Sequence, residues 1–234
     1  KLEQNVRHWI PTGVVLANLG GTQIKQQGID LAMRAVESVE ANALVIHLNP
    51  LQELVQPGGD RDWRGVLEAI QLCADKLPVE VIVKEVGCGI GASAVKKLKQ
   101  AGLQWIELAG RGGTNWASIE IARNSCEKQQ QIAQPFVSWG LNTAQALKMA
   151  RQSCPDMHLI ASGGIRHGLD IARCIRLGAE MTAIAQPFLK PATQSTEAVI
   201  EKIHIFKQQL RWSMFLTGSQ NLKDLRNTNL VSAD

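Results

Sequence analysis

The sequence predicts an α/β fold, and more specifically a (βα)₈ TIM barrel whose first strands are missing from the chain. Strand, glycine-rich loop and helix recur six times along it, a pattern typical of parallel strands joined by helical crossovers. Polar and glycine-rich residues follow the strands, and in barrels chemistry lies at that end of each strand. Six units are two short of eight, and the chain begins at Lys1 close to its first strand. We therefore expect two strands upstream. A doubly wound open sheet is the alternative fold.

Composition and charge narrow the class of protein. With 234 residues, of which 45% are hydrophobic, the chain can bury one core, so we predict a single domain over residues 1–234. The net charge of +4 comes from scattered basic residues, which argues against nucleic-acid binding but suits a phosphorylated ligand. No apolar run approaches the roughly 18 residues of a membrane span. Five dispersed cysteines without a Cys-x-x-Cys motif indicate a reducing cytosol and hence a cytoplasmic location.

Each predicted element has a local signal. The strands are short apolar runs, at residues 14–18, 43–48, 79–86, 103–109, 158–162 and 181–185. Apolar residues three and four apart predict helices between them. We expect Asp60 or Asp62 to cap the helix after the second strand, and Asn142 to cap a later one. A final amphipathic helix over about 195–216 is predicted to turn one apolar row inward, comprising Ile200, Ile203, Phe206, Leu210 and Met214.

The second strand leads into the stretch with the richest candidate chemistry. Because side chains alternate along a strand, His47 and Asn49 share one face. Gln52 and Glu53 follow shortly after the strand ends. Imidazole, carboxamide and carboxylate together suit a hydrated Mg²⁺ and an anionic substrate. The alternative is a lone histidine at a strand end followed by a solvated glutamate, and the residue types alone leave both open.

Two loops near the end of the chain are candidates for phosphate binding. Residues 163–166 read Gly-Gly-Ile-Arg, and Ala185-Gln186 follow the next strand. In barrels the loops after the last two strands commonly hold a phosphate through backbone N–H groups. Glycine lets the backbone approach an anion closely. The alternative is ordinary turn glycine.

Lys84 is the one cation expected on the inner face of a strand. It shares that face with Ile82 and Val86, and a lysine there is costly without a negative partner such as a flavin. Glu85 points the other way and is expected to be structural. The loop at residues 112–116 adds backbone donors, a hydroxyl, an amide and an aromatic wall in Trp116. Cys88 has no histidine nearby in sequence, which argues against a nucleophilic role.

Six motifs, taken together in order, resemble one family. They are Ala17-Asn18-Leu19-Gly20, His47-Leu48-Asn49-Pro50-Leu51-Gln52-Glu53, Val83-Lys84-Glu85-Val86-Gly87, Gly110-Arg111-Gly112-Gly113-Thr114-Asn115-Trp116, Ser162-Gly163-Gly164-Ile165-Arg166 and Met214-Phe215-Leu216-Thr217-Gly218. The chain resembles the type 2 isopentenyl-diphosphate delta-isomerases, flavoproteins of the FMN-dependent barrel class. The resemblance runs from about Ala17 to Arg226.

The resemblance implies site residues position by position. Asn18, Lys84 and Thr114 match positions that contact FMN, and Gln52 a substrate contact. Glu53 matches a Mg²⁺ ligand, with His47, Asn49 and Trp116 as further candidate catalytic residues. The positions that match the phosphate loops are Gly163, Gly164, Ile165, Arg166, Ala185 and Gln186.

The resemblance also implies an activity. Such an isomerase moves the double bond of isopentenyl diphosphate to give dimethylallyl diphosphate, in isoprenoid biosynthesis. It uses FMN reduced by NADPH, with Mg²⁺ on the diphosphate and no net redox change, and it forms a homotetramer or larger. The family's N-terminal Arg-Lys pair and Met-Thr-Gly-Gly flavin loop do not occur in these 234 residues, which agrees with the expected upstream strands.

Two other functions remain open at this point. An FMN-dependent barrel oxidoreductase, acting on a small hydroxy acid or phosphorylated substrate, would share the barrel and Lys84. It would need a His/Arg pair that abstracts a proton and binds a carboxylate, and we expect no such pair to act in the loops after the strands. A phosphate-binding scaffold without catalysis would explain the glycine loops but would leave His47, Asn49, Gln52 and Glu53 without a purpose.

Overall fold

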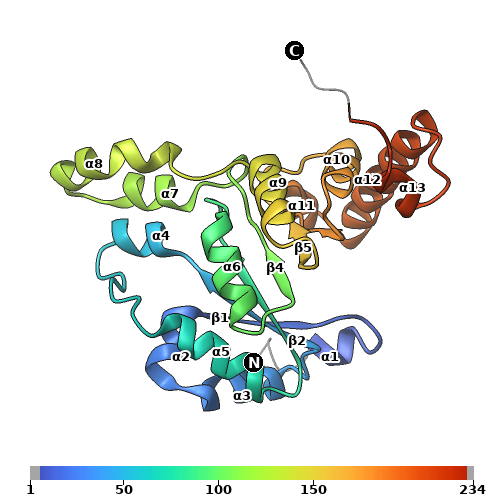
Figure 1. Cartoon of the computed structure of the whole chain (residues 1–234). Coiled ribbons are helices and arrows are strands. Elements are labelled where there is room, and N and C mark those ends of the chain that lie inside the picture. The colour runs from blue at the N-terminus through green and yellow to red at the C-terminus, as the bar shows by residue number, and fades with distance from the viewer. Residues whose placement is uncertain (1–5, 231–234) are drawn as a thin grey trace.

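Six parallel strands form one sheet in the computed structural model, which describes residues 6–230 (Figure 1). Their order in the sheet follows the sequence, so every connection is a crossover between neighbours. The strands are β1 (Leu16–Gly20), β2 (Ala43–Leu48), β3 (Glu80–Glu85), β4 (Trp105–Glu107), β5 (His158–Ala161) and β6 (Met181–Thr182). The predicted alternating α/β architecture is confirmed. That two further strands precede the chain stays a prediction.

Helices fill the connections between strands and continue beyond β6. They are α1 (Val6–Trp9), α2 (Gly21–Gln27), α3 (Ile29–Ser38), α4 (Pro50–Val55), α5 (Val66–Lys76), α6 (Ala92–Gln100), α7 (Trp116–Arg123), α8 (Glu127–Ala133), the 3₁₀ helix η2 (Gln134–Ser138), α9 (Thr143–Ser153), α10 (Gly168–Arg176), α11 (Gln186–Ala192), α12 (Thr196–Leu216) and α13 (Leu222–Arg226). The longest excursion, α7, α8 and η2, separates β4 from β5 and lies beside α4 (Figure 1). No helix in the described part is long and apolar enough to cross a membrane.

Of the two helix caps predicted from the sequence, the structure confirms one and contradicts the other. Asn142 caps α9, where its side chain accepts from the Gln145 backbone N–H at 2.9 Å. The expectation that Asp60 or Asp62 caps α5 is wrong, because Gly65 precedes that helix with φ +82°. Asp62 instead pairs with Lys25 and Arg64. The carboxylates sit too early in the chain to reach the first turn.

The C-terminal helix α12 buries only part of the apolar row expected to face inward. Phe206 is buried, and Leu210 and Met214 pack against the α10–α13 cluster. Ile200 and Ile203 are 46% and 43% exposed, so their predicted inward placement is wrong. The helix packs on α10 and α11, and these neighbours cover only one side of its twenty-one residues.

The two faces of the sheet carry different layers because side chains alternate along each strand. On one face Leu44, Ile46 and Val83 are fully buried in the main core, together with helix residues. On the other, here called the inner face, strand residues pack only on one another. This apolar floor comprises Ala43, Val45, Ile82 and Ile160, flanked by Trp105 and Ala183.

On β2 to β4 a polar row lies one step beyond the apolar floor, toward the carboxyl ends of the strands, while Ile160 stands at the level of this row on β5. The strand register places Gly20, His47, Lys84 and Glu107 side by side on β1 to β4. The side chains of His47, Lys84 and Glu107 therefore come from different strands and point to the inner face, and Gly20 continues the row on β1 without a side chain. The register thus brings together groups that are up to 87 positions apart in sequence, from Gly20 to Glu107.

Glu85 holds the loop that leaves β3. It points away from the inner face, is 6% exposed, and its Oε2 accepts backbone N–H groups of four successive residues, 86–89. Burial raises the pKa of Glu85, and the four N–H donors oppose that shift. The carboxylate replaces the hydrogen bonds that a strand or helix would supply to this loop.

Replacing Glu85 with alanine should destabilise the fold. The N–H groups of residues 86–88 lose their acceptor, whereas that of Gly89 keeps the Ala109 carbonyl, so the free energy of unfolding should fall by about 3 kcal/mol. Chemical denaturation of Glu85→Ala measures the change. Glu80→Ala, at the exposed start of the same strand, is the matched control and should change stability by no more than about 0.5 kcal/mol. Equal losses in the two variants would show that Glu85 has no special structural role.

Candidate active site

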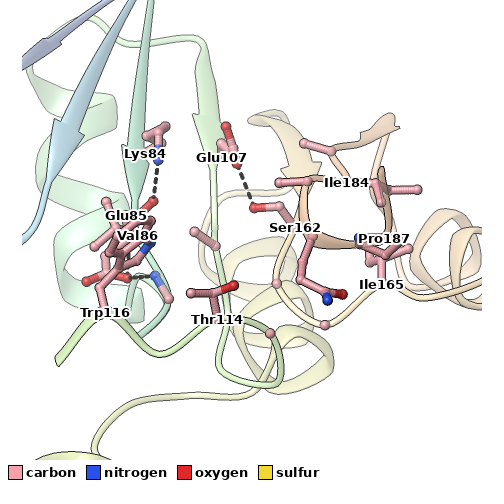
Figure 2. A pocket seen from close by; sticks show the side chains of 18 of the residues that line it. Lys84, Glu85, Val86, Glu107, Thr114, Trp116, Ser162, Ile165, Ile184 and Pro187 are labelled. Carbon is pink, nitrogen blue, oxygen red and sulfur yellow. Dashed lines mark hydrogen bonds between the residues drawn. The ribbon is translucent and has the colours of Figure 1, made fainter. Parts of the chain in front are cut away.

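A cavity of about 530 Å³ opens at the carboxyl ends of β3 to β6 (Figure 2). Strand ends, the two glycine loops and the start of α11 all contribute to its wall. The lining residues that carry the argument are Lys84, Glu107, Thr114, Ser162, Arg166 and Gln186. A ligand in this cavity would meet groups from four successive strands.

The two glycine loops form one wall by packing backbone against backbone. Gly163 has φ +93°, and a Cβ there would lie 1.8 Å from the Gly110 carbonyl oxygen. Gly164 has φ +76°, and a Cβ there would lie 2.6 Å from the Gly112 carbonyl carbon. Glycine is thus required first for loop-on-loop contact. The same absence of side chains leaves the cavity wall open to an anion.

Positive and hydroxyl groups converge on this wall. Lys84 projects from the inner face of β3 and its Nζ donates to the Glu85 carbonyl at 3.0 Å (Figure 2). Arg166 donates to the Gly112 carbonyl at 2.9 Å, which ties the two glycine loops together. Thr114, on the loop after β4, and Trp116, the first residue of α7, also line the cavity. Cation, guanidinium and hydroxyl are a donor set suited to a phosphorylated ligand.

The sequence analysis did not single out Glu107, a charged residue of the cavity lining. Glu107 ends β4 on the inner face, and its Oε1 accepts the hydroxyl of Ser162 at 2.7 Å (Figure 2). The register sets Glu107 beside Lys84. A period-two pattern over residues 105–107 would have found Glu107, because Trp105 and Glu107 share a face.

A second polar group adjoins the cavity after β1 and β2. His47 Nδ1 lies 2.9 Å from Asn18 Oδ1. Asn49, 6% exposed, donates to Glu53 Oε1 at 2.9 Å. Glu53 Oε2 also accepts the Asp60 backbone N–H at 2.8 Å. The amide and the loop backbone therefore fix the orientation of the Glu53 carboxylate.

Gln52 links this group to the α7 excursion. Its Nε2 donates to Glu120 Oε1 at 3.4 Å, and it shares a small hollow with Glu85, Val86 and Trp116. Glu120 was likewise not predicted from the sequence as a site residue. It lies four residues after Trp116, one turn along α7, and only the packing of α4 on α7 brings it to Gln52.

The sequence-predicted residues thus fall into two adjoining groups at one end of the sheet. Lys84, Thr114, Trp116, the loop at residues 163–166, Ala185 and Gln186 line the large cavity. Asn18, His47, Asn49, Gln52 and Glu53 lie outside its lining, on β1, β2 and α4. Residues 85–87 and Trp116 border both the cavity and the hollow that holds Gln52. Among residues 6–230, no three His, Cys, Asp or Glu side chains gather as a metal site.

The surroundings shift the pKa of two groups near the site. Burial lowers the pKa of His47, the Lys84 cation lowers it further, and Glu53 opposes both. Burial raises the pKa of the Cys88 thiol to about 11, with the Glu85 carboxylate adding to the shift. Cys88 is therefore a neutral thiol at pH 7, in line with the prediction against a nucleophilic role.

Known proteins now show where the chain belongs. It is 48% identical over 231 residues to the isopentenyl-diphosphate delta-isomerase of Stutzerimonas stutzeri (strain A1501), covering 98% of this chain and 67% of the relative. It is 45% identical over 234 residues to the same-named protein of Xanthobacter autotrophicus (strain ATCC BAA-1158 / Py2), covering all of this chain and 68% of the relative. The chain belongs to the isopentenyl-diphosphate delta-isomerase family. It spans about two thirds of the length of the relatives it matches.

Two further comparisons agree with the isomerase family at the level of fold. The family model for FMN-dependent dehydrogenases matches residues 58–232. A solved structure of mandelate oxidase with (S)-2-phenylpropionate superposes with a TM-score of 0.64 at 16% identity, covering 92% of this chain and 62% of that one. At that identity the likeness shows the fold alone. The six strands are therefore consecutive strands of a (βα)₈ barrel of the FMN-dependent class.

The lowered pKa of His47 predicts a pH-dependent contribution to stability. Its neutral form is favoured in the fold, so the contribution is complete above the usual pKa of 6.5 and is lost as pH falls below it. The stability difference between the wild type and His47→Gln should therefore shrink from about pH 8 to about pH 5.5. Denaturant unfolding at several pH values measures it. His204→Gln, an exposed histidine on α12, is the control, and parallel curves for wild type and His47→Gln would contradict the prediction.

Proposed function

We propose that the protein containing this chain interconverts isopentenyl diphosphate and dimethylallyl diphosphate, with FMN in the 530 Å³ cavity. The observation that carries the proposal is identity of 45% to 48% with named isomerases over nearly the whole chain, combined with a phosphate-suited cavity. NADPH as the reductant, a homotetramer or larger assembly and a cytoplasmic location rest on the family resemblance.

The cavity fits FMN in size and donor chemistry. Gly163, Gly164, Ile165 and Arg166, with Ala185 and Gln186, would hold the phosphate against the open glycine wall. Lys84 and Thr114 would contact the ring side of the cofactor, and Asn18 would approach from β1. Reduced FMN, when bound, supplies acid–base chemistry at the allylic carbons. Lys84 would stabilise negative charge there, because a nearby cation acts strongly where water is excluded.

The group after β2 fits the metal and the substrate diphosphate. Glu53 is held by Asn49 and by the Asp60 backbone, and Mg²⁺ typically takes one or two carboxylates plus water and phosphate oxygens. Glu53 would hold Mg²⁺, which neutralises the diphosphate. A single ordered carboxylate suits a metal that is completed by substrate.

Gln52 would orient the hydrocarbon end of the substrate. Its amide is tied to Glu120 and lies against Trp116 in the hollow beside the cavity. Trp116 would exclude water from the reacting carbons. His47 and Asn49 would support this end of the site, with His47 neutral because of its lowered pKa.

A hydroxy-acid oxidoreductase shares the fold but fits the lining less well. Such chemistry needs a histidine beside an arginine to take a proton and bind a carboxylate. The described lining of the cavity contains Lys84 and Arg166 but no histidine. The likeness to mandelate oxidase is a likeness of fold at 16% identity.

The test is an assay of the full-length protein with FMN, NADPH, Mg²⁺ and isopentenyl diphosphate. We expect dimethylallyl diphosphate as the product, with far less NADPH consumed than product formed. Product analysis and flavin absorbance give both readouts. Oxidation of a hydroxy acid with stoichiometric flavin reduction, or no product at all, would refute the isomerase proposal.

Replacing Glu53 with glutamine should weaken the use of Mg²⁺. The amide keeps the shape but loses the charge, so turnover at limiting Mg²⁺ should fall at least about tenfold. Excess Mg²⁺ should restore part of it, which a titration of rate against Mg²⁺ concentration measures. Glu68→Gln, an exposed glutamate on α5, is the matched control. Unchanged Mg²⁺ dependence in Glu53→Gln would remove Glu53 from the metal site.

A further inference from the structure

Glu107 places a negative charge in a cavity otherwise suited to anions. It lies on β4 in register with Lys84 on β3, and neighbouring strands are about 4.8 Å apart. Its carboxylate lines the same wall as Lys84 and Ser162 (Figure 2). An anion beside the expected site of a phosphorylated cofactor needs a reason, because it opposes binding.

The two carboxylates of this wall are used differently. Glu85 turns to the other face, where four backbone N–H groups bind it. Glu107 accepts the Ser162 hydroxyl at 2.7 Å and stays on the inner face. Ser162 is itself buried, so the hydrogen bond anchors the carboxylate toward the cavity.

Apolar neighbours of Glu107 strengthen the electrostatic effect of its carboxylate. Trp105 lies two residues before Glu107 on the inner face of β4, and Ile160 is the register partner of Glu107 on β5; both belong to or flank the apolar floor. These apolar neighbours lower the local dielectric around the carboxylate, so its charge acts more strongly on a ligand in the cavity than it would in water. Of the other members of the row, Lys84 carries the opposite charge, while Gly20 has no charge and His47 favours its neutral form.

We propose that Glu107 is a positioning residue that offsets the charge of Lys84 and thereby lowers the preference of the site for reduced over oxidised flavin. The inference rests on the proposed function, because it requires FMN in the cavity. Reduction of oxidised FMN to its anionic reduced form adds two electrons and one proton, so the ring gains one negative charge. Lys84 favours that gain and Glu107 opposes it.

The test compares the flavin potential of full-length wild type with three variants. Dithionite supplies the electrons in a titration against a reference dye, and absorbance of the flavin reports its redox state. Glu107→Gln should bind reduced FMN about tenfold more tightly relative to oxidised FMN, which for a two-electron couple is a potential about 30 mV more positive. Glu107→Asp keeps the charge and should stay close to wild type.

Glu80→Gln is the matched charge control. It makes the same change on β3, four residues before Lys84, which is about 13 Å along the strand. Its potential should equal that of wild type. An unshifted potential in Glu107→Gln, or an equal shift in Glu80→Gln, would overturn the inference.

Two further outcomes keep the test decisive. If wild type binds no FMN, the proposed function and this inference fail together, whereas FMN binding with no Glu107 effect removes the inference alone. If Glu107→Gln does not fold, Ser162→Ala takes its place. That variant removes the hydroxyl that partly offsets the charge of Glu107, so the carboxylate opposes reduction more strongly; a smaller shift to more negative potential is expected, and no shift overturns the inference.

Discussion

The site depends on one constraint, the alternation of side chains along parallel strands that are held in register. On β2, β3 and β4 the alternation sends one set of residues to the helices and the other to the inner face. Register then aligns His47, Lys84 and Glu107 in a single row above an apolar floor. A slip of one residue in any strand would reverse its faces. The polar row forms because a single register buries apolar side chains on both faces of the sheet.

Glycine residues and the Glu85 carboxylate hold the loops in place around the cavity. The glycine loops at residues 110–113 and 163–164 approach so closely that a Cβ on either side would meet backbone atoms. The loop after β3 also meets backbone, since Gly89 N–H donates to the Ala109 carbonyl, and the Glu85 carboxylate holds it from the other side. Both devices hold the loops through contacts to backbone groups. The glycine wall therefore has defined contacts while remaining accessible to an anionic ligand.

Much of the architecture could be predicted because its signals are local. All six strands, their parallel order and the Asn142 cap follow from short-range patterns of apolar residues, glycine and asparagine. The assignment of Glu85 to the outer face needed only a period of two. The prediction that Asp60 or Asp62 caps α5 was wrong because the helix begins only at Val66. The identity of a capping residue does not show how many residues separate it from the start of the helix. The prediction that Ile200 and Ile203 face inward was wrong because amphipathic spacing does not show how far the neighbouring helices extend along α12.

The sequence by itself determined the fold class, the family and which residue types meet at the carboxyl ends of the strands. Those features depend on periodicity and on motifs that are contiguous in the chain. Only the tertiary structure decided that Gln52 meets Glu120, that Glu107 meets Ser162, and that the β2 group lies beside the cavity rather than in it. These pairings arise from packing between elements far apart in sequence. No local pattern records such distances, because they depend on the register and packing of the whole sheet.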